Sequence, residues 1–196
     1  MRNKLGTICM ILGTVLILAA LSLFLWNRRE DEQAAVASAD ILPQVLTYIE
    51  EAAEAPAPPD PFDPTMTEAE IDGYMYIGYL SIPDLGLELP VMAEWDYKRL
   101  NIAPCRYAGS TKTDDLVIAA HNYASHFGGL SGLSGGEQVI FVDMDNVVSA
   151  YTVVAVEILA PTAVEEMTNG EYDLSLYTCT YGGRSRVTVR CDRAEG

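Results

Sequence analysis

The chain begins with an uncharged apolar segment that is long enough to cross a lipid bilayer. Residues 5–26 form a run of 22 residues without Asp, Glu, Lys or Arg. At about 1.5 Å per residue, a helix of this length spans roughly 33 Å, more than the hydrocarbon thickness of about 30 Å. We therefore predict a single membrane-crossing helix near the N-terminus.

The flanks of this segment indicate its orientation only weakly. Arg2 and Lys4 precede it and Arg28 and Arg29 follow it, so the positive-inside rule decides little. The short N-terminal flank favours a cytoplasmic N-terminus, a single-pass anchor in the cell membrane and an extracellular remainder. Residues 37–39 (Ala-Ser-Ala) resemble a signal-peptidase site, but they lie beyond a charged stretch, so we favour a tethered protein over a cleaved one.

The charge of the chain is strongly negative and unevenly distributed. The net charge is −16, and residues 30–96 contain 16 Asp or Glu with no Lys or Arg. Such a stretch argues against nucleic-acid binding and is typical of a solvated stalk.

The part after the anchor divides into a stalk and a domain. Asp40 is predicted to cap an amphipathic helix whose apolar residues recur at helical spacing. The helix ends where a Pro-rich linker begins. We predict an anchor over 1–29, a stalk over 30–73 and a domain over 74–196. We expect a chain that starts near Asp63 to be soluble and active.

The predicted domain is mainly β. Short β-type runs alternate with turn signals, which indicates a sandwich or a closed barrel. The runs cover residues 76–82, 87–92, 106–108, 116–120, 138–143, 151–159, 174–179 and 186–191. Short helices are predicted only at 95–100 and 126–133.

Three residues at the ends of these runs suggest nucleophilic catalysis. Cys179 ends one run and Arg186 begins the next, seven residues later, after a turn that contains Gly182 and Gly183. His121 follows the apolar run 116–120. A thiolate needs a base nearby and a cation or donor that stabilises the acyl oxyanion, and these residues would supply both.

The pattern resembles the sortases, membrane-anchored cysteine transpeptidases of Gram-positive bacteria. Residues 175–179 (Ser-Leu-Tyr-Thr-Cys) are similar to the family's Thr-Leu-x-Thr-Cys signature, and His121-Asn122 is similar to the Gly-His-Asn of class B-type members. Residues 79–83 resemble the strand that opens the family's barrel. Ser175 and Ala120 depart from the usual Thr and Gly, which puts the subclass in doubt more than the chemistry.

The resemblance implies a closed eight-stranded β-barrel and a defined set of roles. Cys179 would form a thioester with a C-terminal sorting motif of a secreted protein, His121 would serve as acid and base, and Arg186 would stabilise the oxyanion. Substrate contacts are expected at Thr178, Asn122 and Tyr181. The acyl group would pass to an amine of the cell wall, such as a peptidoglycan precursor, without a cofactor or metal. We expect Arg184 and Arg190 to matter less.

Several alternatives stay open on the sequence alone. Asp60-Pro61-Phe62 resembles the lid of pilin-polymerising sortases, which keeps that activity, with a pilin amine as acceptor, as the alternative. A thiol peptidase that transfers the acyl group to water and a non-enzymatic tethered barrel are the others. Cys105 and Cys191 would be exported, so they are either bonded or two buried thiols. His126 is expected to serve in capping or packing.

Overall fold

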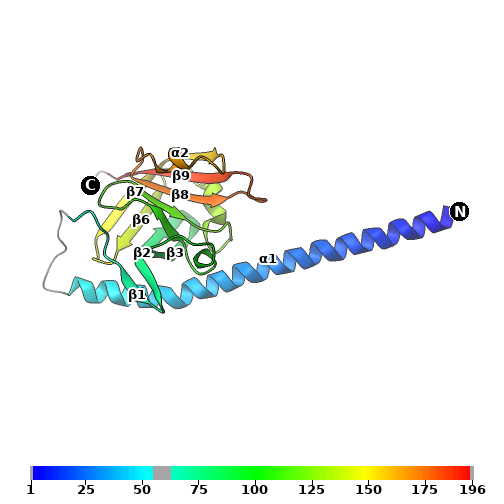
Figure 1. Ribbon diagram of the computed structural model, residues 1–196, viewed down its shortest axis with the longest axis horizontal. Helices are drawn as coiled ribbons and strands as arrows, with labels where there is room; N and C mark the ends of the chain where they lie inside the picture. The colour runs from blue at the N-terminus through cyan, green and yellow to red at the C-terminus, as the bar shows by residue number, and fades with distance from the viewer. Residues whose placement is uncertain (1, 55–62, 195–196) are drawn as a thin grey trace.

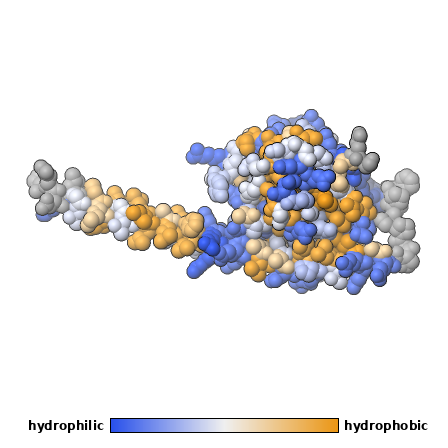
Figure 2. Space-filling view, turned by 180° about the vertical axis from the view of Figure 1, so that it is seen from behind, coloured by the Kyte–Doolittle hydropathy of each residue, from blue (hydrophilic) through white to orange (hydrophobic). Residues whose placement is uncertain are grey.

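A computed structural model describes residues 2–54 and 63–194, and it begins with one long helix (Figure 1). Helix α1 (Arg2–Ala53) contains 52 residues. The predicted lid, residues 60–62, lies outside the described residues. The first part of α1 projects from the rest of the molecule, and the last part passes beneath the barrel. Figure 2 shows the apolar surface of the projecting part and the hydrophilic surface where the helix meets the barrel.

The prediction that Asp40 begins a separate helix is wrong, because α1 continues through that position. Residues 27–39 contain no Gly or Pro, so nothing in them interrupts a helix. Pro43 lies inside α1 and removes one backbone hydrogen bond, the one to the carbonyl of Ala39. Ala39 and Pro43 are both on the exposed face of the helix, where water can satisfy that carbonyl.

The strands form a closed barrel of eight members, as predicted. Their order around the barrel is β2-β3-β4-β5-β8-β9-β7-β6, and a β2–β6 pairing closes it. The bounds are β2 (Tyr74–Ile82), β3 (Leu87–Met92), β4 (Cys105–Ala108), β5 (Leu116–Ala119), β6 (Gln138–Asp143), β7 (Val148–Leu159), β8 (Leu174–Cys179) and β9 (Arg186–Arg193).

The structure adds one strand to those predicted, and it places a glycine where the barrel closes. A short strand, β1 (Ala69–Ile71), pairs antiparallel with the start of β2 through a turn at Asp72 and Gly73, both at positive φ, and it forms no part of the closed barrel. Gly78 lies where β2 meets β6, and a Cβ there would lie 2.0 Å from the carbonyl oxygen of Val142. A side chain at this position would therefore push the closing strands apart.

Helices between the strands are short. The predicted helix at 95–100 is reduced to η2 (Arg99–Asn101), and that at 126–133 is η3 (Phe127–Gly132). Two more were not predicted, η1 (Pro83–Leu85) and α2 (Val164–Thr168).

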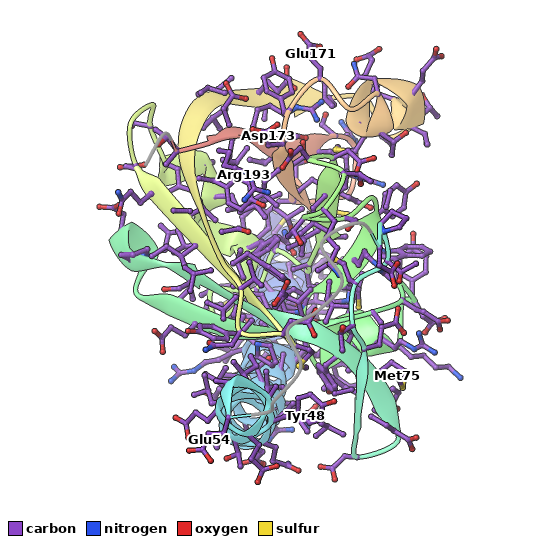
Figure 3. All side chains as sticks on the ribbon, turned by 90° about the vertical axis from the view of Figure 1, so that its left-hand side faces the viewer. Tyr48, Glu54, Met75, Glu171, Asp173 and Arg193 are labelled. Carbon is purple, nitrogen blue, oxygen red and sulfur yellow. The ribbon has the colours of Figure 1, made fainter. Side chains whose placement is uncertain are left out.

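The protein has a second hydrophobic core between α1 and the outer wall of the barrel. Ile41, Val45 and Ile49 on α1 are 7%, 0% and 4% exposed. They pack in one cluster with residues such as Met92 and Met144. Figure 3, a view along α1, shows Tyr48 and Glu54 on the helix beneath the barrel, with Asp173 and Arg193 far from it. The same helix is long and apolar enough to cross a membrane, and its last part belongs to the folded domain.

Because of this second core, we expect a chain that starts near Asp63 to be less stable than the sequence suggested. Burial of a large aliphatic side chain contributes roughly 1.5–3 kcal/mol, so losing three such side chains removes a large share of a domain's net stability of about 5–15 kcal/mol. We predict that a chain starting at Asn27 folds, whereas one starting at Asp63 is strongly destabilised. Thermal unfolding of the two purified proteins measures the difference.

A matched pair of substitutions in the full-length protein tests the same point. Val45→Asp places a carboxylate in the second core and should lower the melting temperature by well over 5 °C. Val36 is 60% exposed on the same helix, so Val36→Asp should leave it nearly unchanged. Equal melting temperatures for the two variants would contradict the role of α1 in the fold.

Candidate active site

Strands β8 and β9 place Cys179 and Arg186 directly opposite each other. The two strands pair antiparallel, and Cys179 is the register partner of Arg186 at the turn end of the hairpin. The turn between them contains Gly182 and Gly183, both at positive φ, and Thr180 N donates to Ser185 O at 3.0 Å. Strand register therefore places the two residues opposite each other, and their joint role in catalysis stays a prediction.

Strand β5 brings His121 to the same end of the barrel. It runs parallel to β8, with Ala119 opposite Tyr177, and Ala120 N donates to Tyr177 O at 3.2 Å. The buried Thr178 hydroxyl donates to Ala120 O at 2.8 Å. In continuation of this parallel register, His121 follows at the level of Cys179. Thr178 therefore holds the two strand ends together, and a contact of this residue with substrate stays a prediction.

His121 is half-buried and its environment favours the neutral imidazole. Burial lowers the pKa of His121, and the nearby charge of Glu30 on α1 opposes this effect. The ring centroids of His121 and Tyr123 lie 4.9 Å apart, and Phe127 N donates to His121 O at 3.1 Å. A neutral imidazole near pH 7 is the form that accepts a proton from a thiol or an amine.

Helix α1 holds the loop that carries His121. Asp31 accepts hydrogen bonds from the backbone N and Oγ of Ser125, at 3.0 and 2.5 Å. Farther along α1, Ser38 Oγ lies 2.5 Å from Ile102 O and 3.1 Å from His126 Nε2. Because the single Ser38 proton goes to Ile102 O, we assign the other contact to donation from His126 Nε2–H.

His126 has a packing role, as expected for the second histidine. Its side chain is fully buried, and it makes no side-chain cap to η3. Burial is the main cause that lowers the pKa of His126 to about 4. The imidazole is therefore neutral at physiological pH and links α1 to the loop that carries His121.

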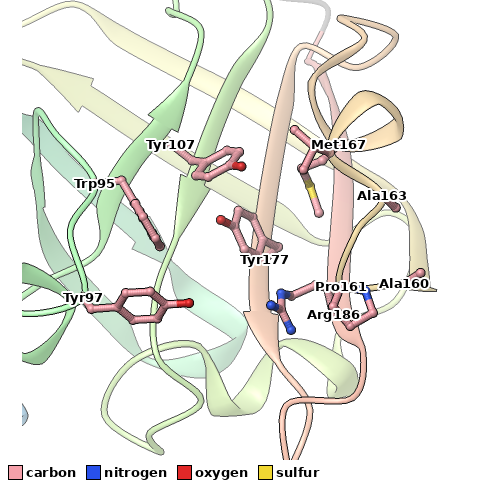
Figure 4. Close-up of a pocket in the computed structure, with 10 residues that line it drawn as sticks. Trp95, Tyr97, Tyr107, Ala160, Pro161, Ala163, Met167, Tyr177 and Arg186 are labelled. Atoms are coloured by element: carbon pink, nitrogen blue, oxygen red, sulfur yellow. The ribbon is translucent and has the colours of Figure 1, made fainter.

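An aromatic groove leads to Arg186 on one side of the strand ends (Figure 4). The cavity has a volume of about 210 Å³ and is lined in part by Trp95, Tyr97, Tyr107 and Tyr177. The Tyr107 and Tyr177 rings meet edge to face, with centroids 5.4 Å apart. Rigid aromatic walls next to a single cation suit a peptide with apolar side chains and a carbonyl at its reactive end.

The residues of this groove come from separate parts of the chain. Trp95 and Tyr97 come from the segment after β3, Tyr107 from β4 and Tyr177 from β8. Only Tyr177 lies next to a recognised motif, so no local pattern joins the four residues.

A second hollow, of about 590 Å³, lies on the other side of His121. Asn122 and Tyr181, both expected to contact substrate, line it together with His121 and with α1 residues such as Phe24 and Glu30. Helix α1 thus contributes directly to the surroundings of the candidate base.

Arg190 is a buried structural residue, and the expectation that it matters less than Arg186 for the reaction stays a prediction. It is 3% exposed, and it donates to Glu157 Oε1 at 2.7 Å, to Ser175 Oγ at 2.8 Å and to Glu166 O at 2.8 Å. The last of these contacts holds the segment of α2, whose Met167 lines the aromatic groove. Ser175, one of the departures from the family signature, is thus a partner of Arg190.

The other two cysteines of the barrel are buried. Cys105 belongs to the core beside α1 and Cys191 to the barrel interior, and both thiols are free. Burial raises the pKa of each to about 12. Cys179 is half-buried at a strand end, which leaves it as the accessible thiol of the barrel.

Known proteins resemble this chain in sequence and in fold. The family model of the sortase domain matches residues 80–194. Sortase C1 from Streptococcus suis is 26% identical, with a TM-score of 0.53, over 62% of this chain and 74% of that chain. Sortase C from Streptococcus pneumoniae is 21% identical, with a TM-score of 0.57, over 86% and 96%. No match was found among curated proteins.

Proposed function

Because the chain belongs to the sortase family, we propose that it is a membrane-anchored transpeptidase in which Cys179, His121 and Arg186 carry the reaction. The observation that supports this most is the convergence of three strand ends, since β5, β8 and β9 bring these residues to one end of the barrel. The aromatic groove supplies a binding site that ends at Arg186.

The first half-reaction forms an acyl-enzyme. His121 takes the proton of the Cys179 thiol, and the sulfur attacks the carbonyl carbon of the peptide bond that is cleaved. The oxyanion that forms lies beside the guanidinium of Arg186, whose charge is permanent. His121 then gives its proton to the leaving amine, the C–N bond breaks, and a thioester on Cys179 remains.

The second half-reaction passes the acyl group to an amine. A neutral amine attacks the thioester carbonyl, a C–N bond forms and the C–S bond breaks. The proton lost from nitrogen goes to His121, and the Cys179 thiolate is released. The proton then returns to the sulfur, which restores the starting state.

The donor is proposed to be the C-terminal sorting signal of a secreted protein and the acceptor an amine of the cell wall. The class B-like sequence patterns favour a wall acceptor. The similar solved structures are named sortase C, and the name of the pneumococcal one refers to pilin substrate specificity, which favours the alternative of a pilin amine. We further propose that the uncharged part of α1 crosses the cell membrane once with its N-terminus inside, and that the catalytic domain over 74–196 lies outside, with the last part of α1 packed against it.

A partition experiment tests the proposed transfer. The purified protein is incubated with a panel of peptides from C-terminal sorting signals, with and without triglycine as the amine. We expect a thioester adduct by intact-mass spectrometry, and a product joined to triglycine when the amine is present. A hydrolysed product that triglycine leaves unchanged would identify a thiol peptidase, and no adduct with any peptide would indicate a binding protein.

A further inference from the structure

The end of the barrel that carries His121 lies close to the point where α1 would leave the membrane. The uncharged run of α1 ends at Trp26, and Asp31 is already held by the barrel through the Ser125 backbone N at 3.0 Å. Five residues of helix correspond to about 7.5 Å along the axis. Because α1 has no break in this interval, the distance between the barrel and the apolar run is fixed.

This distance is comparable to the thickness of the headgroup layer. A bilayer is about 40–45 Å thick with its headgroups and about 30 Å without them, which leaves roughly 5–7 Å for each layer. A transmembrane helix tilts by about 20° on average, and this brings one side of the barrel still closer to the lipid. The loop of His121 therefore lies at the outer edge of the headgroups.

The turn between β8 and β9 faces the same way. Tyr181 and Gly182 line the hollow beside His121 together with Phe24 and Asn27 of α1. Phe24 belongs to the uncharged run, so the turn reaches the level at which that run ends. In Figure 1 the β8–β9 hairpin points to the side from which α1 leaves the barrel. Tyr181 is 91% exposed, and Tyr and Trp are the residues enriched at membrane interfaces.

This end of the molecule is less acidic than the rest, and it presents two arginines without an acidic partner among the described residues. The acidic side chains of α1 here are engaged, since Glu30 accepts from Trp26 Nε1 at 2.7 Å, Glu32 pairs with Arg28 at 2.8 Å and Asp31 binds Ser125. Arg29 and Arg184 form no ion pair within residues 2–54 and 63–194. The acidic and basic side chains named here balance each other, whereas the whole protein has a net charge of −16, so an anionic leaflet repels the rest of the protein more strongly than this end.

We propose that residues 181–184 dock on the anionic headgroups of the membrane that α1 crosses, so that the hollow beside His121 opens onto the bilayer surface. Tyr181 enters the interface and Arg184 pairs with lipid phosphate. The docking depends only on α1 as the anchor. Its consequence, that a substrate retained in the membrane reaches the acyl-enzyme without leaving the surface, rests on the proposed function.

Quenching by brominated lipids tests the docking in the full chain. Trp26 and Trp95 are replaced by Phe, and Tyr181→Trp provides a single fluorophore in vesicles that contain phosphatidylglycerol. The matched control is Tyr48→Trp in the same background, because Tyr48 is also partly exposed and lies 22 residues beyond Trp26, roughly 33 Å along the helix. Lipids brominated near the headgroup are expected to quench the fluorophore at 181 strongly and that at 48 hardly at all.

The charge dependence provides the second arm of the test. Arg184→Glu, added to the Tyr181→Trp protein, should lower the ratio of docked to undocked turn by at least about fivefold, because one basic residue near an anionic surface contributes roughly that factor. High salt should act in the same direction. Equal quenching at 181 and 48, or quenching at 181 that is unchanged in vesicles of phosphatidylcholine alone, would overturn the proposal. An inactive enzyme would leave these readings unaffected, so the proposed function and the docking fail separately.

Discussion

Replacing Cys179 by Ala should abolish formation of the acyl-enzyme and leave the fold intact. The thiol is half-buried at the end of β8, so its removal takes one sulfur from the edge of the barrel. Without a nucleophile no thioester forms, and neither His121 nor Arg186 can replace it. Intact-mass spectrometry with the sorting-signal peptides measures the adduct, and circular dichroism measures the fold.

Cys105→Ala is the matched control for this prediction. Cys105 is fully buried and has a pKa of about 12, so its loss should leave the rate of acylation nearly unchanged once folded protein is compared. A thioester that persists in the Cys179→Ala protein, or that disappears in the Cys105→Ala protein with its fold preserved, would show that the nucleophile has been assigned to the wrong cysteine.

Arg186→Ala should lower the rate of acyl transfer by roughly 100- to 1,000-fold, which is typical for the loss of one well-placed oxyanion donor. Arg186 is the register partner of Cys179 and lies at the end of the aromatic groove. Its guanidinium is held by the carbonyl oxygens of Gly183 and Ser185, at 3.3 and 3.2 Å. Arg186→Lys should restore only part of the rate, because a single ammonium does not reproduce the guanidinium geometry. Single-turnover rates of thioester formation measure both variants.

Substitutions of the two neighbouring arginines distinguish an effect on catalysis from an effect on folding. Arg184 lies in the exposed turn, and Arg184→Ala should change the rate on a soluble peptide by less than severalfold. Arg190→Ala removes a buried network and should reduce the free energy of unfolding by roughly 2–4 kcal/mol. The rate of acylation in the Arg190→Ala protein should fall only in proportion to the fraction of the protein that is unfolded. An Arg184→Ala protein that is fully folded but has lost most of its rate of acyl transfer would contradict the catalytic role of Arg186.

The sequence alone supported the barrel strands and the candidate catalytic residues. Alternating apolar residues report directly which side of a strand is buried, and turn residues between them mark where strands end. Cys179 and Arg186 are joined by a short turn, so a hairpin suffices to place them opposite each other. The position of His121 beside them required more, because β5 and β8 are parallel strands far apart in the chain and the pairing was implied only by the family resemblance.

The role of α1 could not be derived from the sequence. The apolar spacing of Ile41, Val45 and Ile49 predicts a helix with a buried face, but a helical period does not say which surface covers that face. Asp40 is a good cap and Pro43 a good first-turn residue, so local rules favoured a new helix there. Packing of the continuous helix against the barrel outweighs the hydrogen bond lost at Pro43.

What the sequence by itself determined is therefore the local part of this protein: the apolar anchor, the run of strands and the residues that end them. Tertiary structure alone decided how distant segments meet. It assembled four aromatic residues into a groove, buried Arg190 beneath α2 and placed Asp31 and Ser38 of the anchor helix on the loop of His121. The reason is physical, since periodicity and turn chemistry act between near neighbours in the chain. These contacts form only when a closed barrel and a helix pack together, and their energy comes from surfaces buried jointly by both.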